Sequence, residues 1–121
     1  MGAPTRATKE LKVTIAAGAA ESGAIHMAEY AAGIVILPAA WTEADLGLKV
    51  CGSAEGTFVP LKDLSNAYGT DVSVDGAAAS AAYPLPLMAF AAPYIKLWSH
   101  DGSGNGVNQN SARTLTVFLK A

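Results

Sequence analysis

The sequence contains few charged residues and only one cysteine. Of its 121 residues 15% are charged, and the net charge is −2. Typical soluble domains carry about 25% charged residues. The basic residues are scattered, so we expect no nucleic-acid partner, because such a partner requires a basic patch that neutralises phosphates. Cys51 has no second cysteine with which to form an intrachain disulfide. The first ten residues lack an apolar signal-peptide core, which favours synthesis in a reducing cytoplasm.

Long apolar helices and catalytic motifs are also missing. The uncharged stretch 76–95 has the 20-residue length of a membrane span. It contains Pro84, Pro86 and Pro93, however, and an interior proline costs a helix about 3 kcal/mol. We therefore predict no membrane partner. The sequence has no P-loop, no GxSxG and no GxGxxG motif, so we expect neither enzyme activity, catalytic residues nor a cofactor.

Candidate groups for metal or nucleophile chemistry are few. His26 and His100 are the only histidines, and no CxxC or HxxxH spacing suits zinc. Sequence separation leaves a Cys51–His nucleophile pair open, but a small, partly buried Cys51 is the favoured interpretation, and we place His26 on the wetter face of a strand. Residues 101–106, DGSGNG, match the first half of a calcium loop. Ala112 stands where that loop needs its bidentate glutamate, so we expect a glycine-rich turn and no metal site.

The sequence is rich in alternation with period two, which is typical of strands with one buried face. Three segments show it clearly, with inward residues Leu11, Val13 and Ile15, then Leu46, Leu48 and Val50, then Leu115, Val117 and Leu119. The apolar run 33–38, GIVILP, indicates a central strand covered on both faces. Segments 23–30 and 71–75 predict weaker strands, and SAEGTF around Gly56 predicts a hairpin.

These patterns predict an all-β fold, a β-sandwich that is jelly-roll-like, with about eight short strands. A closed barrel is the alternative. One or two short helical turns are expected, at 41–47 with Thr42 as N-cap and at 61–69. We predict a flexible N-terminal arm over 1–9 and a single sandwich domain over 10–121. Trp41 is expected to anchor the core.

The stretch 76–95 is better explained as an edge strand than as a helix. Proline is confined to edge strands and strand starts, because it cannot donate to a sheet ladder. Alternation places Tyr83, Leu85 and Leu87 toward the core. The other face carries Pro84, Pro86 and Met88 and has no charge, so we predict that a neighbouring subunit covers it.

A second candidate surface combines an aromatic residue with amides. Glycan-binding sites use such a pairing, and here the candidates are Trp98, Asn105, Asn108 and Gln109. Surface turns have a similar composition. A carbohydrate-binding or host-adhesion module, with host surface glycans as partners, is therefore the alternative function.

Residues 33–63, GIVILPAAWTEADLGLKVCGSAEGTFVPLKD, together with YIKLWS (94–99) and RTLTVFLKA (113–121), resemble small structural proteins of tailed bacteriophages, in particular capsid decoration or cement proteins. The resemblance is one of pattern and spans roughly residues 11–120. It implies a structural virion protein, made in the host cytoplasm, that binds the outer surface of an assembled head and stabilises it. The implied partners are the major capsid protein and further copies of the chain, for example in a trimer. Contacts would come from the arm, through Thr5 and Arg6, and from the Pro84–Met88 face. A tail or connector subunit of the same fold is a further alternative.

Overall fold

The computed structural model describes residues 8–63 and 70–121. Within these residues the chain forms eleven strands and one 3-10 helix. The elements are β1 (Thr8–Ile15), β2 (Ile25–His26), β3 (Ala32–Ile36), β4 (Ala44–Cys51), β5 (Val59–Pro60), β6 (Lys62–Asp63), β7 (Thr70–Asp71), β8 (Ser73–Ala77), β9 (Ala82–Pro84), η1 (Leu87–Ala91), β10 (Tyr94–His100) and β11 (Arg113–Lys120).

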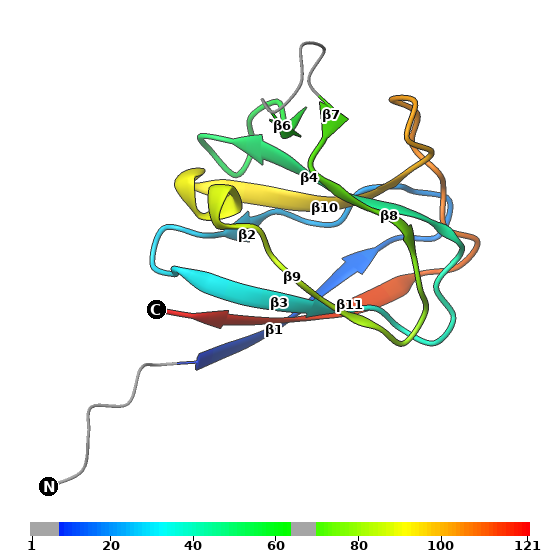
Figure 1. Cartoon of the computed structure of the whole chain (residues 1–121), viewed down its shortest axis with the longest axis horizontal. Helices are drawn as coiled ribbons and strands as arrows, with labels where there is room; N and C mark the ends of the chain where they lie inside the picture. Colours follow the sequence, from blue (N-terminus) through cyan, green and yellow to red (C-terminus); the bar gives the residue numbers. More distant parts are fainter. Residues whose placement is uncertain (1–7, 64–69) are drawn as a thin grey trace, which may run out of the picture.

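Two antiparallel sheets pack face to face, which confirms the predicted all-β sandwich. The first sheet has the order β1-β11-β3-β9, and Figure 1 shows it as the lower layer. The second has the order β2-β10-β4-β5, and β8 also pairs with β4. It forms the upper layer in Figure 1. Strands β6 and β7 form a separate two-stranded ladder.

The core follows the predicted alternation. Leu115, Val117 and Leu119 of β11 are fully buried between the layers. On the opposite face of the same sheet, Lys12 donates a hydrogen bond to the Thr116 hydroxyl at 3.1 Å. Trp41 is buried in the core cluster, as predicted. Strand β11 therefore buries one face and leaves the other partly wet, as strands of antiparallel sheets commonly do.

The predicted helical turn at 41–47 is wrong, because strand β4 begins at Ala44. The groups expected to cap a helix at Thr42 are used by another segment. Its backbone N–H donates to Gln109 Oε1 at 2.9 Å, and its hydroxyl accepts from Arg113 at 3.2 Å. Burying Ala44, Leu46 and later alternate residues of β4 against the core outweighs a short local helical signal.

Strand β3 differs from its prediction in another way. The run 33–38 does form a strand between two others, but Ile34 is 41% exposed. The outer face of the first sheet is open in the single chain. The expected cover on both faces is therefore wrong for Ile34.

Two further predictions fall at the margins of the described residues. The second helical turn, 61–69, lies largely outside them, and its described part forms β6. Strand β1 begins at Thr8, so the sandwich includes two residues that we had assigned to the arm. Residues 1–7, with Thr5 and Arg6, lie outside the described residues. Among the residues described, no helix is long and apolar enough to cross a membrane.

Candidate functional site

The stretch 82–91 begins with β9, which lies at one edge of the first sheet. Strand β9 pairs only with β3 in the described structure, through Ile36↔Ala82, Val35↔Tyr83 and Ile34↔Pro84, which confirms an edge strand at this position. Pro84 has no N–H to offer to a further strand, and the next N–H, from Leu85, donates to Gly33 at 2.9 Å. The outer side of β9 therefore lacks a donor at Pro84, which disfavours the addition of a further strand.

The strand is shorter than predicted. After Pro86 the chain turns into the 3-10 helix η1, in which the Ala89 N–H donates to the Pro86 carbonyl at 3.0 Å. The change of period places Ala89 in the core instead of Leu87. Leu87 is 81% exposed, so its predicted burial is wrong, whereas Leu85 is buried as predicted.

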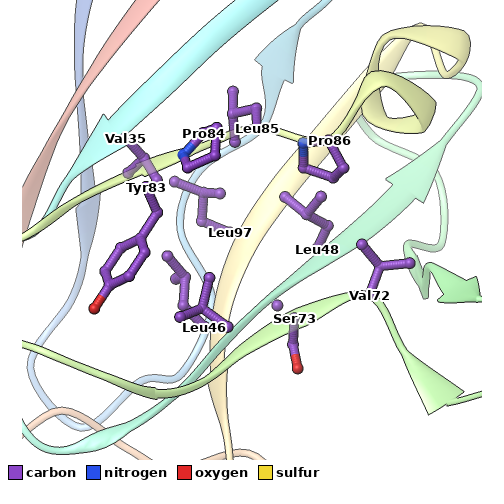
Figure 2. A pocket seen from close by; sticks show the side chains of 12 residues that line it. Val35, Leu46, Leu48, Val72, Ser73, Tyr83, Pro84, Leu85, Pro86 and Leu97 are labelled. Atoms are coloured by element: carbon purple, nitrogen blue, oxygen red, sulfur yellow. The ribbon is translucent and has the colours of Figure 1, made fainter.

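An apolar pocket of about 160 Å³ opens between this edge and the second sheet. Its lining comes from both layers and includes Val35, Leu46, Leu48, Val72, Leu85 and Leu97. In Figure 2 the side chains of Leu48 and Leu97 lie beneath the segment that carries Pro84 and Pro86. The Tyr83 ring is fixed at the pocket wall, because the Ala78 N–H donates to its hydroxyl at 2.8 Å.

Exposed apolar side chains continue along the chain from the pocket wall. Leu87 and Met88 of η1 follow directly after Pro86, and Met88 is 47% exposed. Pro84 is exposed and Pro86 half-buried. We name the pocket together with Pro84, Pro86, Leu87 and Met88 the apolar edge. It contains no charged side chain, and its contact with a neighbouring subunit remains a prediction.

A second surface lies on the outer face of the upper sheet. Trp98 stacks on His100 with ring centroids 4.6 Å apart, and Lys49 Nζ lies 4.4 Å from the Trp98 ring. Lys49 also forms an ion pair with Glu21. The stack covers Gly47, which is opposite Trp98 in the ladder. The shallow hollow next to it measures about 430 Å³ and is lined by both polar and apolar groups.

The structure does not bring the four candidate glycan residues to one open surface. Trp98 is only 3% exposed and lies under Lys49, so no open aromatic platform is present for a sugar ring. Gln109 is fully buried, and its amide bonds both backbone groups of Thr42. Asn105 and Asn108 are exposed. Glycan binding remains a prediction that these positions do not support.

The glycine-rich loop 101–106 is closed by its own aspartate. Asp101 accepts hydrogen bonds from the backbone N–H of Ser103 at 2.7 Å, from the Asn105 side chain at 3.0 Å and from the Asn105 backbone N–H at 3.2 Å. These donors, the Ser103 N–H first, lower the pKa of Asp101 below its usual value. The carboxylate thus shapes the turn.

The possible cysteine–histidine pair is separated by a strand. Cys51 and His26 are both paired with Tyr94, from opposite sides of β10. Two strand spacings put them about 10 Å apart, which is beyond hydrogen-bond reach. Cys51 is half-buried and His26 exposed, as predicted. Within the described part of the chain, no three His, Cys, Asp or Glu side chains gather closely enough to hold a metal ion.

Sequence reasoning found the β9 side of the apolar edge but missed the side formed by the second sheet. The residues missed are Leu46, Leu48, Val72 and Leu97. Alternation assigned Leu46 and Leu48 to the core and Val72 to a weak strand, whereas Leu97 lies in a segment that was used only for the resemblance. The weak, isolated Val72–Val74 alternation was the available signal that a second sheet edge lies here.

A comparison with protein-family models finds no match, and comparisons with curated proteins and with solved structures also find none. The fold and its surfaces therefore define the class directly, as a small antiparallel β-sandwich with an apolar edge. The described residues show no cluster that could hold a metal ion.

Proposed function

We propose that this protein is a structural virion protein, a capsid decoration or cement protein that binds the outer surface of an assembled tailed-phage head. The sequence pattern over 33–63 supports the virion setting by resemblance. The apolar edge supports binding to another protein. The proposed partner is the major capsid protein, and the proposed location is the virion after synthesis in the host cytoplasm.

The size of the pocket carries the proposal. Sites for drug-sized ligands usually measure about 300–1,000 Å³. A dry cavity of about 150 Å³ holds a benzene-sized group. The pocket here, at about 160 Å³, therefore suits one leucine or phenylalanine side chain better than a metabolite. Protein interfaces commonly place one such anchor in a pocket, surrounded by contacts that exclude water.

The surroundings of the pocket suit the same kind of partner. Leu87 and Met88 project from a short 3-10 helix and provide apolar area outside the pocket. A methionine side chain adapts its shape to an irregular surface. Pro84 offers no N–H on the outer side of β9, which disfavours strand addition, so we expect the partner to bind through side chains instead of through a new sheet ladder.

Binding of this type would stabilise a shell by mass action. A protein that binds the assembled state and not the free subunits lowers the free energy of the assembled state alone. Many symmetry-related copies would allow weak single contacts to act together. The role therefore requires no catalytic group.

The proposal is tested with purified particles and with bare shells. We expect the protein in purified virions and bound to shells that lack it. Electron microscopy of the particle would locate it on the head, and density on the tail or connector instead would replace this proposal with that alternative. Absence from particles together with no binding to shells would refute both locations.

A surface variant tests the apolar edge. Leu87→Gln should lower shell affinity at least tenfold, the loss associated with about 1.4 kcal/mol. Its free energy of unfolding should change by less than about 0.5 kcal/mol, because the side chain is already exposed. Val59→Gln is the control, since Val59 is also exposed but lies on β5, opposite Val50 and outside the apolar edge. Equal affinity of Leu87→Gln and the unchanged protein would remove the apolar edge from the interface.

A further inference from the structure

Strand β1 presents an open sheet edge on the side of the molecule away from the apolar edge. It is the first strand in the order β1-β11-β3-β9, and its eight residues all pair with β11 (Figure 1). On its other side, the only recorded pairing among the described residues is the bridge between Ile15 and Ser22. The segment Thr8–Thr14 therefore has an edge of backbone N–H and C=O groups available for a further strand.

The open segment has a defined centre. Ser22 occupies the edge at Ile15, so seven residues remain, and Leu11 is the middle one. Unlike β9, this segment contains no proline. Leu11 and Val13 face the core but are only half-buried, so part of their apolar surface lies at the border of the sandwich.

We propose that β1 is a self-association surface, on which a second copy of this chain adds its own β1 antiparallel about a two-fold axis at Leu11. The two first sheets would then form one continuous sheet across the dimer. In this register Leu11 faces the partner's Leu11, and Thr8 faces the partner's Thr14. Glu10 faces the partner's Lys12, and this pair occurs twice because a two-fold interface repeats each contact.

Charge selects this register over its neighbours. Opposite charges directly across an antiparallel ladder are favourable, and like charges are unfavourable. A slip that places Glu10 at the axis would put two glutamates opposite one another, and the slip in the other direction would pair two copies of Lys12. Those two slips shift one strand by two residues against the other. A shift by a single residue would instead turn the buried faces of the two copies to opposite sides of the joint sheet. Only the register centred on Leu11 pairs opposite charges and keeps both buried faces on one side.

The side chains involved are exposed, although Lys12 Nζ also donates a hydrogen bond to the Thr116 hydroxyl at 3.1 Å. Within one chain Lys12 Nζ lies 3.6 Å from Glu10 Oε1, and the two side chains are 62% and 54% exposed. Such exposed pairs contribute little to stability. Exchanging this contact for one across the dimer therefore loses little. A seven-residue strand is a small interface, so we expect a weak dimer with a dissociation constant in the micromolar to millimolar range.

Charge exchange provides the test. Sedimentation velocity over a concentration series should show a monomer–dimer equilibrium for the unchanged protein. E10K and K12E alone each create two like-charge pairs and should weaken the dimer at least tenfold. The double exchange, E10K with K12E, should restore it. An equimolar mixture of E10K and K12E, one of them labelled with ¹⁵N, should form mixed dimers by native mass spectrometry.

Two variants control for net charge. Glu29→Lys and Lys62→Glu make the same charge changes at exposed positions that lie outside the β1–β11 ladder, and should leave the dimer unchanged. Circular dichroism of every variant confirms that it is folded. A protein that stays monomeric at millimolar concentration would overturn the proposal, as would single exchanges that dimerise as strongly as the unchanged chain. The test uses the free protein, so its result is independent of shell binding.

Discussion

The stack of Trp98 on His100 allows a sharp test of packing through Gly47→Ala. A Cβ built on Gly47 would lie 2.7 Å from Trp98 Nε1 and 2.7 Å from His100 Nε2. Ordinary contact begins at 3.4 Å, so the methyl group would be roughly 0.7 Å too close to both rings. Both rings are buried and lie against each other, so neither can move away without disturbing the stack.

Two opposing effects set the size of the change. Overpacking of this kind costs about 1–3 kcal/mol. Replacing glycine by alanine recovers about 0.4–1 kcal/mol, because the unfolded chain loses conformational freedom. We expect a net loss of about 1–2 kcal/mol in the free energy of unfolding. For a chain of this size that loss lowers Tm by about 4–8 °C.

Urea and thermal unfolding followed by far-ultraviolet circular dichroism measure the effect without relying on the fluorescence of Trp98 itself. Gly52→Ala is the matched control, because a Cβ there meets nothing within 4 Å, and it should be neutral or slightly stabilising. Adding His100→Ala to Gly47→Ala should cost less than the sum of the two single changes, since one of the two close contacts is then removed and the Trp98 ring can shift into the space that His100 leaves. A Gly47→Ala protein at least as stable as the unchanged one would refute the reasoning.

Two further predictions concern buried and loop polar groups. Gln109→Ala removes the amide that bonds the N–H and C=O of Thr42, and leaving these groups unsatisfied should cost about 1–3 kcal/mol in urea unfolding; a change below about 0.5 kcal/mol would show that water replaces the amide. The pKa of Asp101 is lowered in the folded state, so its ionised form stabilises the fold above the unfolded pKa, and this contribution is lost as pH falls through the folded pKa. A pH titration of the Asp101 carboxyl group followed by NMR should find its pKa below 3.8, and Asn105→Ala should raise this pKa. An unchanged pKa in that variant would exclude the Asn105 side chain as a cause.

The sequence was sufficient to predict the sandwich because alternation in β4 and β11 reports directly which side chains are buried. It was insufficient at Thr42, where a local capping signal competed with contacts to Gln109, which is 67 residues away. A hydrogen-bond partner that is so distant in the sequence produces no periodic pattern in the residues around Thr42. Leu87 was misplaced for a different reason: two prolines suggested continued extension, but the chain turns after Pro86 into a 3-10 helix that buries Ala89 in the core instead.

In the candidate surfaces, too, some features could be predicted from the sequence and others could not. The uncharged face at Pro84 and Met88 was readable from composition alone. The pocket next to it was not, because it forms where the ends of two sheets meet and requires Leu48 and Leu97 from strands far away in sequence. Trp98 was misjudged for a related reason: a tryptophan beside a polar loop resembles a binding platform until its neighbours in space are known.

The place of β11 within the first sheet has a consequence for how the chain folds. This strand lies between β1 and β3, which have no ladder with each other. Lys12 and Thr116, which bond across the β1–β11 ladder, are 104 residues apart. During synthesis, which proceeds from the N-terminus, β1 and β3 must wait with their apolar faces uncovered until β11 has left the ribosome. Contacts of such long range make folding slow, and an unpaired strand is most prone to associate wrongly in that interval. Among the described strands, the layer that β11 joins is therefore completed after the other, and one of the two sheets depends on β11.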